Sequence, residues 1–481
     1  MAVRGQRVRS IKVAAILVAM MLVTAACGAR LTKTELAKAA GSGGQNVSVG
    51  AFGADQGGAA GADQGSAGGG GTAAGAAGGA AGGSTSKSGG GTAQAQGAAS
   101  SCGASGGNTD VGVTGNSITL ANVSLLTGPV PGLFKGAKDG TQAFFNYQNS
   151  LGGVCGRKLQ LDARDDQFDA NQNKAQYQDA IGKDFGFVGS FSVVDEGGAS
   201  VLAAHPDVPD AAYALSHAHF NLPNNFSPQP LPPGWRLGPL NYFKAKFGPP
   251  VIEHMAIFVE DAQSAKDAAA GEQKAAESVG YKFAYSRVIE PTEANFSPDV
   301  VKMQQNGVKG IMMAGETGVF VRMAKAMKQQ NFSVPFANWG ANAYDPAFVT
   351  SDAAPATNGS ILDQQLAMYQ GEDNLPEIQL FNKWLKQVGG KPDIFAAFGW
   401  ESARLFVQAL TAAGSKPTRA GVMAQLKQID NFDGNGMLAP AGPASKRPPT
   451  CFIVINVQNG KFVRADPPSG FICNQGDYFK A

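Results

Sequence analysis

Side chains suited to holding a small molecule gather in the loops that follow predicted strands. In the first half of the chain they are Thr127, Ser190, Phe191, Ser192, Ser216 and His217, and in the second half Asp261, Glu316, Thr317, Trp339 and Asn342. Serine hydroxyls and loop N–H groups can hold a carboxylate. Glu316 or Asp261 could pair with an ammonium group, and Phe191 and Trp339 could form apolar walls. These residue types predict a binding site rather than a reactive centre.

Motifs for catalysis or metal binding give little support to other chemistry. The chain has no H-E-x-x-H or P-loop motif and no nucleophile elbow of the G-x-S-x-G type, because its one match to those letters, at 103–107, lies in the Gly/Ala-rich segment before the first predicted strand. Asp165 and Asp166 are adjacent on an extended segment, so their side chains should point apart. His217 and His219 would point the same way at a strand end and could share a metal, but no acidic partner lies at an obvious spacing. We therefore expect no enzyme activity, no cofactor and no metal, and two polar loop histidines.

The elements that must position these loops alternate between strands and helices. Strands are predicted over 117–123, 158–164, 185–189 and 210–215, with helices over 134–148, 171–183 and 196–204. After a proline-rich stretch over 222–238, helices are predicted over 240–247, 265–279, 298–306 and 318–329, with strands over 255–259, 283–289, 310–314 and 335–338. Helices over 376–388, 395–413 and 419–428 and a hairpin over 451–464 follow. The alternation predicts an α/β fold of two doubly wound, Rossmann-like lobes.

The N-terminus has the layout of an export signal. Arg4, Arg7, Arg9 and Lys12 precede an apolar run to residue 23, and Ala25, Ala26 and Cys27 follow. The run is short for a membrane span. The sequence Val-Thr-Ala-Ala-Cys resembles a bacterial lipobox, which implies a signal peptide over 1–26 and a lipid on Cys27. The alternative is an ordinary signal with a chance cysteine. Lipidation would anchor the exported chain to the outer face of the cytoplasmic membrane.

Residues 27–109 read as a tether. They are mostly Gly, Ala, Ser, Gln and Thr, and they bury too little apolar surface to offset chain entropy. A Gly-rich segment of this length has a reach of roughly 50 Å. The net charge of the whole chain is +2 and no basic cluster follows the signal, so the sequence gives no case for a nucleic-acid partner.

Cysteine usage fits an oxidising compartment. Of five cysteines, lipidation of Cys27 leaves four, which allow three pairings. Cys451 and Cys473 flank the predicted hairpin segment, so we expect them to pair with each other. That leaves Cys102 and Cys155, whose bond would pin the end of the tether to the first lobe. Free buried thiols are the alternative, and the absence of C-x-x-C gives no support to zinc binding.

Several motifs together resemble the type I periplasmic binding proteins, specifically the leucine/isoleucine/valine-binding class. They are Leu126-Thr127-Gly128-Pro129, Gly136, the turn N-S-L-G-G-V-C-G-R-K-L at 149–159, Asp165-Asp166 and Gly280-Tyr281. The resemblance covers about residue 114 to the C-terminus. It implies two discontinuous lobes joined by three crossings, 110–238 with about 365–436, and 239–364 with about 437–481. It also implies a monomer that closes on a ligand between its lobes and delivers it to the permease subunits of an ABC importer.

The departures from that family concern the ligand. The family's carboxylate-binding Ser falls near Val193, beside Ser192, its Thr falls near Ala218, and its acidic residue falls near Trp339 or Gly340. The resemblance therefore predicts a small polar or amino-acid-like ligand but not a free branched-chain amino acid. A ligand-sensing protein that reports to a receptor or regulator is the alternative to transport.

Overall fold

The computed structural model describes residues 102, 106–128, 130, 132–350, 352–371 and 374–481. The predicted signal peptide, Cys27 and nearly all of the tether lie outside this range. No helix in the described part is long and apolar enough to span a bilayer.

The first lobe is built on a four-stranded parallel sheet in the order β2-β1-β3-β4. Its strands are β1 (Ser117–Ser124), β2 (Lys158–Asp165), β3 (Phe187–Val188) and β4 (Asp210–Ala211), and the helices between them are α4 (Lys135–Ser150), α5 (Ala170–Ile181) and α6 (Glu196–Ala204). β1 is central, and Ile118, Leu120 and Val123 are fully buried. A central parallel strand is covered on both faces, which explains why Asn122 and Ser124 of β1 are buried together with its apolar residues.

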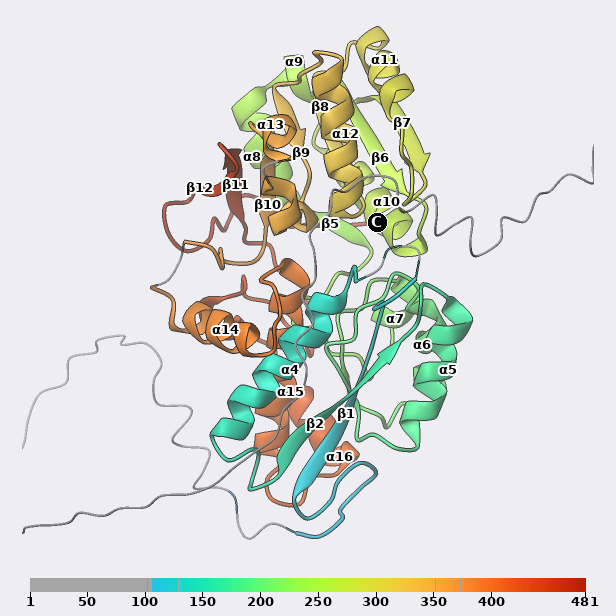
Figure 1. Ribbon diagram of the computed structural model, residues 1–481, viewed down its shortest axis with the longest axis vertical. Coiled ribbons are helices and arrows are strands. Elements are labelled where there is room, and N and C mark those ends of the chain that lie inside the picture. Colours follow the sequence, from blue (N-terminus) through green and yellow to red (C-terminus); the bar gives the residue numbers. More distant parts are fainter. Residues whose placement is uncertain (1–101, 103–105, 129, 131, 351, 372–373) are drawn as a thin grey trace, which may run out of the picture. The chain divides into compact units, whose positions relative to one another are not determined.

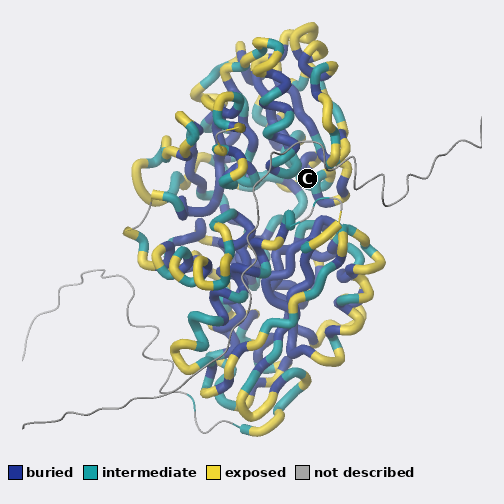
Figure 2. The backbone as a smooth tube through the Cα atoms, in the orientation of Figure 1, coloured by how far each residue is buried: buried dark blue, intermediate teal, exposed yellow. Residues whose placement is uncertain are grey.

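The second lobe contains a seven-stranded sheet in the order β12-β11-β10-β9-β8-β6-β7. Its strands are β6 (Met255–Glu260), β7 (Phe283–Ile289), β8 (Gly310–Ala314), β9 (Phe336–Asn338), β10 (Ile361–Gln364), β11 (Ile453–Gln458) and β12 (Lys461–Asp466). The helices are α8 (Leu237–Phe247), α9 (Pro249–Ile252), α10 (Gln263–Ser278), α11 (Ser297–Gln305), α12 (Thr317–Gln329) and α13 (Ala354–Thr357). The sheet is parallel from β7 to β10, and β11 and β12 are added antiparallel. Figure 2 shows buried residues concentrated along the strands and exposed residues on the outer helices and turns.

Three later helices return to the first lobe. They are α14 (Pro376–Gln387), α15 (Ile394–Ala412) and α16 (Arg419–Leu426), and α15 lies beside α4 (Figure 1). Gly140 and Gly399 allow this close approach, because a Cβ on Gly140 would lie 1.9 Å from the Ala396 carbonyl oxygen and one on Gly399 2.1 Å from that of Ala137. The two glycines therefore set the distance between these helices.

The chain crosses between the lobes three times, and the crossing segments are hydrogen-bonded to one another. Gln229 Nε2 donates to the Ala439 carbonyl (2.8 Å), and Ala439 N donates to the Gln365 carbonyl (2.8 Å). Ala367 N donates to the Met437 carbonyl (2.8 Å). The first crossing also contains β5 (Gly234–Arg236), which pairs with β13 (Tyr478–Lys480) near the end of the chain. The three segments thus form one connected hinge.

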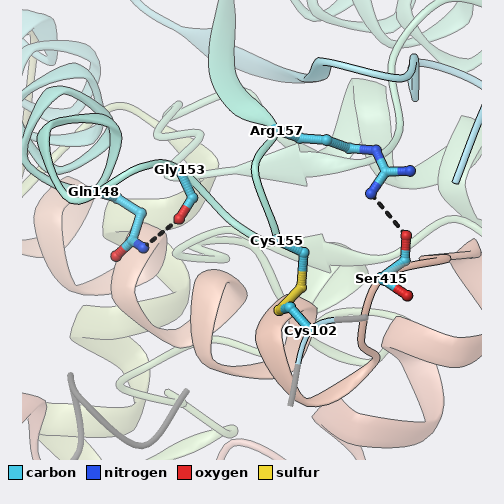
Figure 3. The surroundings of a disulfide bond; sticks show 6 residues. All are labelled: Cys102, Gln148, Gly153, Cys155, Arg157 and Ser415. Atoms are coloured by element: carbon cyan, nitrogen blue, oxygen red, sulfur yellow. Dashed lines mark hydrogen bonds between the residues drawn. A yellow bond between two sulfur atoms is a disulfide. The ribbon is translucent and has the colours of Figure 1, made fainter. Parts of the chain in front are cut away.

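Both expected disulfides are present, Cys102–Cys155 and Cys451–Cys473, which confirms the predicted pairing. Near Cys155 the buried Arg157 guanidinium donates to the carbonyl of Ser415 (2.7 Å), as Figure 3 shows. It also donates to the carbonyls of Gly106 (2.6 Å) and Thr114 (2.8 Å). The disulfide and Arg157 together hold the segment around residue 106 against the first lobe.

The structure corrects the prediction that His217 and His219 lie at a strand end. Both belong to the short helix α7 (His217–Phe220), where residues two apart do not share a face. His217 reaches outward to Asp267 of α10, with Nδ1 3.7 Å from Oδ2. His219 is buried, with Nδ1 3.0 Å from Asp195 Oδ2 and Nε2 2.7 Å from Asp210 Oδ2. The sequence spacing showed no acidic partner for either histidine, because the fold brings these three carboxylates from other elements.

Two carboxylates keep His219 charged. Burial alone would lower the pKa of His219, but the charges and hydrogen bonds of Asp210 and Asp195 outweigh it and raise the pKa to about 10, from an ordinary value of 6.5. A raised pKa stabilises the fold fully below the unfolded value, and this contribution is lost as the pH rises through the folded value.

We predict that the stability advantage of the wild type over His219→Gln shrinks as the pH rises from about 6.5 towards about 10, by up to roughly 1 kcal/mol per pH unit. At about pH 6.5 the substitution should cost a few kcal/mol, because it leaves two buried carboxylates without their cation. Urea unfolding followed by circular dichroism at several pH values measures both. His205→Gln, at an exposed site, is the control and should show neither effect. An advantage that stays constant with pH would contradict this account of His219.

Candidate functional site

A cavity of about 180 Å³ lies between the two lobes, where strands from both sheets end. Its first-lobe wall is aromatic. Phe134 precedes α4, Phe191 and Tyr213 follow β3 and β4, and Phe395 and Phe398 lie on α15. Phe191 and Tyr213 stack with ring centroids 4.9 Å apart, and Phe134 and Phe395 meet edge-on at 4.7 Å. These contacts fix each ring through its neighbours, so the wall is formed before any ligand arrives.

The second-lobe wall comes from the ends of β6, β8 and β9 and from one face of α10. It is formed mainly by small or apolar residues, including Ala262, Ala265, Ala268, Met313, Gly315, Phe320, Trp339 and Ala341. Trp339 is 2% exposed, and its Nε1 donates to Ser360 Oγ (2.8 Å). The small side chains on α10 leave the space that a ligand body would fill.

One charged pair lies at the hinge side of the cavity. Arg236 of β5 forms an ion pair with Asp363 of β10, with Nη2 3.0 Å from Oδ2, and the guanidinium lies 5.0 Å from the centre of the Trp235 ring. Asn338 Nδ2 donates to the other Asp363 oxygen (2.8 Å). Both members of the pair are buried. A buried charge persists where it is paired and hydrogen-bonded, as these two are.

Three further carboxyl groups face the cavity. Glu316 caps α12 by accepting hydrogen bonds from Gly318 N (2.5 Å) and Val319 N (2.7 Å). Glu260, at the end of β6, accepts from Glu316 N (2.9 Å); burial, with the nearby charge of Glu316, raises its pKa to about 7. Glu272 lies on α10, and burial followed by the charge of Asp363 raises its pKa to about 8. Glu260 and Glu272 are therefore largely protonated or half-protonated in the empty cavity near neutral pH.

Four of the residues predicted from the sequence line this cavity: Phe191, Glu316, Trp339 and Asn342. The others lie outside its lining and have local partners. Thr127 bonds Asp165, Ser190 accepts from Val123 N (3.0 Å), Ser192 accepts from Val194 N (3.1 Å), Ser216 caps α7, His217 faces Asp267, Asp261 pairs with Lys266, and Thr317 donates to the Asn342 carbonyl (2.7 Å). The hydroxyl groups expected to bind a carboxylate thus stabilise loops and a helix end.

Four charged residues of the cavity were not identified from the sequence, and these are Arg236, Glu260, Glu272 and Asp363. The uncharged Gln365 of the hinge was not identified either. For Glu260 a signal existed. It is the last residue of β6, directly before the predicted Asp261, and neighbours along a strand point to opposite sides. Asp261 accordingly points outward to Lys266 while Glu260 faces the cavity. For Arg236 and Asp363 no signal was available, because neither β5 nor β10 is predicted from the sequence.

Solved structures of several binding proteins share this fold. A fatty acid ABC transporter substrate-binding protein from Thermomonospora curvata is 19% identical, with a TM-score of 0.64 over 78% of this chain and 95% of that one. A branched-chain amino acid ABC transporter from Thermus thermophilus with bound valine is 16% identical, with a TM-score of 0.63 over 78% and 97%. A putative branched-chain amino acid ABC transporter from Rhodospirillum rubrum is 18% identical, with a TM-score of 0.56 over 73% and 100%.

At these identities the likeness concerns the fold, which is that of the type I periplasmic binding proteins. No curated protein matches the chain. The sequence model of the family described as periplasmic binding protein matches residues 117–461, which is most of the chain and includes the four-stranded sheet and all but the last strand of the seven-stranded sheet. This match confirms the resemblance seen in the sequence motifs, and the chain belongs to the periplasmic binding protein family, whose members bind solutes and are not enzymes.

Proposed function

We propose that this protein is an exported, lipid-anchored solute-binding protein that holds one small molecule between its lobes and delivers it to an ABC importer. The observation that carries the proposal is the cavity itself. It is lined from both lobes, it is largely apolar, and it contains a few buried charged groups, which is the usual composition of a ligand site. The named functions of the structural neighbours, ABC transporter substrate-binding proteins among them, agree with this role.

The hinge supplies the mechanism. We take the lobes as 110–238 with about 365–436, and 239–364 with about 437–481. Bending at the crossing segments would close the lobes around a ligand and exclude water, and a permease could then distinguish closed from open forms. The ligand can favour closure only by binding the closed form more tightly. Contacts to both walls, such as Phe191 and Trp339, would provide that difference.

The site we propose comprises Phe191, Glu316, Trp339 and Asn342 from the sequence prediction, together with the charged residues Arg236, Glu260, Glu272 and Asp363. Ser190 and Ser192 are left out of it, because neither side chain lines the cavity. The sequence predicts a small polar or amino-acid-like ligand, but a ligand with a larger apolar part fits this lining better.

A blocking substitution tests the site. We predict that a ligand found by thermal-shift screening of the full chain, with amines, acids, alcohols, amides and short peptides as the test set, raises the melting temperature by several degrees. Ala268→Trp should abolish the shift, because the new ring would fill the cavity from α10. Ala270→Trp, at an exposed position on the same helix, should leave the shift intact.

The screen has two further readouts. The melting temperature of Ala268→Trp without ligand should stay close to that of Ala270→Trp, which shows that the cavity is filled and the fold kept. Mass spectrometry of the released ligand should find it unaltered. A shift that survives Ala268→Trp would contradict the location of the site, and a chemically altered ligand would contradict the binding role.

The anchor is tested separately. In a bacterial host that processes lipoproteins, we predict that the full chain takes up labelled palmitate and sediments with membranes, and that Cys27→Ser abolishes the label and releases the chain. Thr32→Ser, a few residues later in the sequence, should retain the label. An unlabelled wild-type chain found in the soluble fraction would show that the lipid anchor is wrong.

A further inference from the structure

Two of the charged groups in the cavity have their charges matched by the protein. Arg236 is paired with Asp363, as described above. Glu316 accepts two N–H groups at the start of α12, where the helix dipole favours a negative charge, and Arg322 Nη2 lies 3.5 Å from its Oε1. Neither Asp363 nor Glu316 therefore needs a ligand to balance it.

Glu260 and Glu272 are not matched in this way. Within the described residues, no Lys, Arg or His lies within ion-pair distance of either carboxyl, and nothing hydrogen-bonds to the side chain of Glu272. The charged and titratable groups that face Glu272 are Arg236, Asp363 and Tyr281, and those that face Glu260 are Glu316 and Arg322. The cavity thus holds two carboxyl groups without a cation of their own.

A third hydrogen-bond acceptor, with no partner among the described residues, lies at the hinge side of the cavity. Gln365 lines the cavity, is 4% exposed, and its Oε1 has no hydrogen-bond partner in the described part of the chain. A buried acceptor without a partner costs free energy that a ligand donor would recover. Arg236 Nε is also without a partner, but its guanidinium already donates to Asp363. Most of the polar groups in the cavity that have no partner within the described residues are therefore acceptors, which a ligand with hydrogen-bond donors would satisfy.

Resting on the proposed binding function, we infer that the ligand is a compact amine, with an apolar body and a cationic head that meets Glu272, and without a carboxylate. A free amino acid would place its carboxylate among four acidic side chains, while the hydroxyl groups of Ser190, Ser192 and Ser216 lie outside the lining of the cavity. The ammonium group would supply the missing partner for the Glu272 carboxyl group.

The walls fit such a molecule. An apolar cavity of about 150 Å³ can hold a benzene ring, so 180 Å³ suits one ring or a short aliphatic chain with a small head. Phe191, Tyr213 and Trp339 line the same space, so the apolar body of the ligand would meet aromatic rings. Size and wall chemistry therefore point to the same class of ligand as the unmatched carboxyl groups.

The affinity for the ligand should change with pH in a direction that depends on the charge of the ligand. An amine stays protonated below about pH 9, whereas Glu272 must be ionised to pair with it. Affinity for an amine should therefore rise between about pH 6 and about pH 8, by as much as tenfold per pH unit. A carboxylate ligand would show the opposite trend, because protonated Glu272 would donate to it.

Four probes that share one ring test the charge of the head: 2-phenylethylamine, 2-phenylethanol, 3-phenylpropionate and L-phenylalanine. On the full chain, calorimetry at about pH 8 should give the tightest binding for the amine, at least tenfold tighter than for the other three. Glu272→Gln should weaken the amine at least tenfold and flatten its pH dependence, with little effect on the alcohol. Glu277→Gln, on the exposed side of α10, is the matched control and should change nothing.

Each outcome separates the inference from the function on which it rests. Equal binding of amine and alcohol, preference for either carboxylate-bearing probe, or no binding of the amine would overturn the inference. The binding function would still stand if another compound gives a shift that Ala268→Trp abolishes. If no compound of any class shifts the chain, the proposed function itself fails.

Discussion

The hydrogen bonds among the three crossing segments are the constraint on which the rest of the molecule depends. Gln229, Ala439 and Gln365 tie three distant parts of the chain into one strip between the lobes. A strip of this kind lets two packed bodies rotate by changing a few dihedral angles while their cores stay intact. Because the side chain of Gln365 also lines the cavity, a ligand that binds it would contact the hinge directly.

The second determining feature is the cost of burying carboxyl groups in an aromatic cavity. An unpaired buried carboxylate is costly, so the group takes up a proton instead. The raised pKa values of Glu260 and Glu272 reflect this cost. His219 shows the converse in the first lobe, where two carboxylates surround one imidazole and keep it charged. One network is complete and supports the fold, whereas the other is incomplete and leaves a place for a ligand.

Much of the fold could be predicted from the sequence because apolar runs such as 255–259 and 310–314 alternate with clear helical segments. The strands 283–289 and 310–314 and the helix 196–204 have the predicted bounds. β10 escaped prediction because its four residues, Ile361–Gln364, include two polar side chains and follow a loop. α7 was misjudged because four residues are too few to show helical periodicity, so both histidines were placed on a strand end.

The site was harder to predict than the fold. Loop residues after strands identified the correct ends of the sheets, and Phe191, Glu316, Trp339 and Asn342 line the cavity. Sequence cannot reveal which polar side chain is already engaged, and Ser190, Ser192 and Thr127 each have a partner elsewhere in the fold. Arg236 and Asp363 meet across more than a hundred residues of sequence, within elements too short to recognise.

The number of protons released on binding tests most directly whether an amine pairs with a carboxyl group that is protonated in the empty cavity. Calorimetric titration with 2-phenylethylamine near pH 7, repeated in buffers that differ in ionisation enthalpy, reports the protons exchanged for each ligand bound. We expect a net release approaching about one proton per ligand, because Glu272, which is protonated in the empty cavity, ionises beside the ammonium group. Net proton uptake, or binding without any exchange, would contradict it.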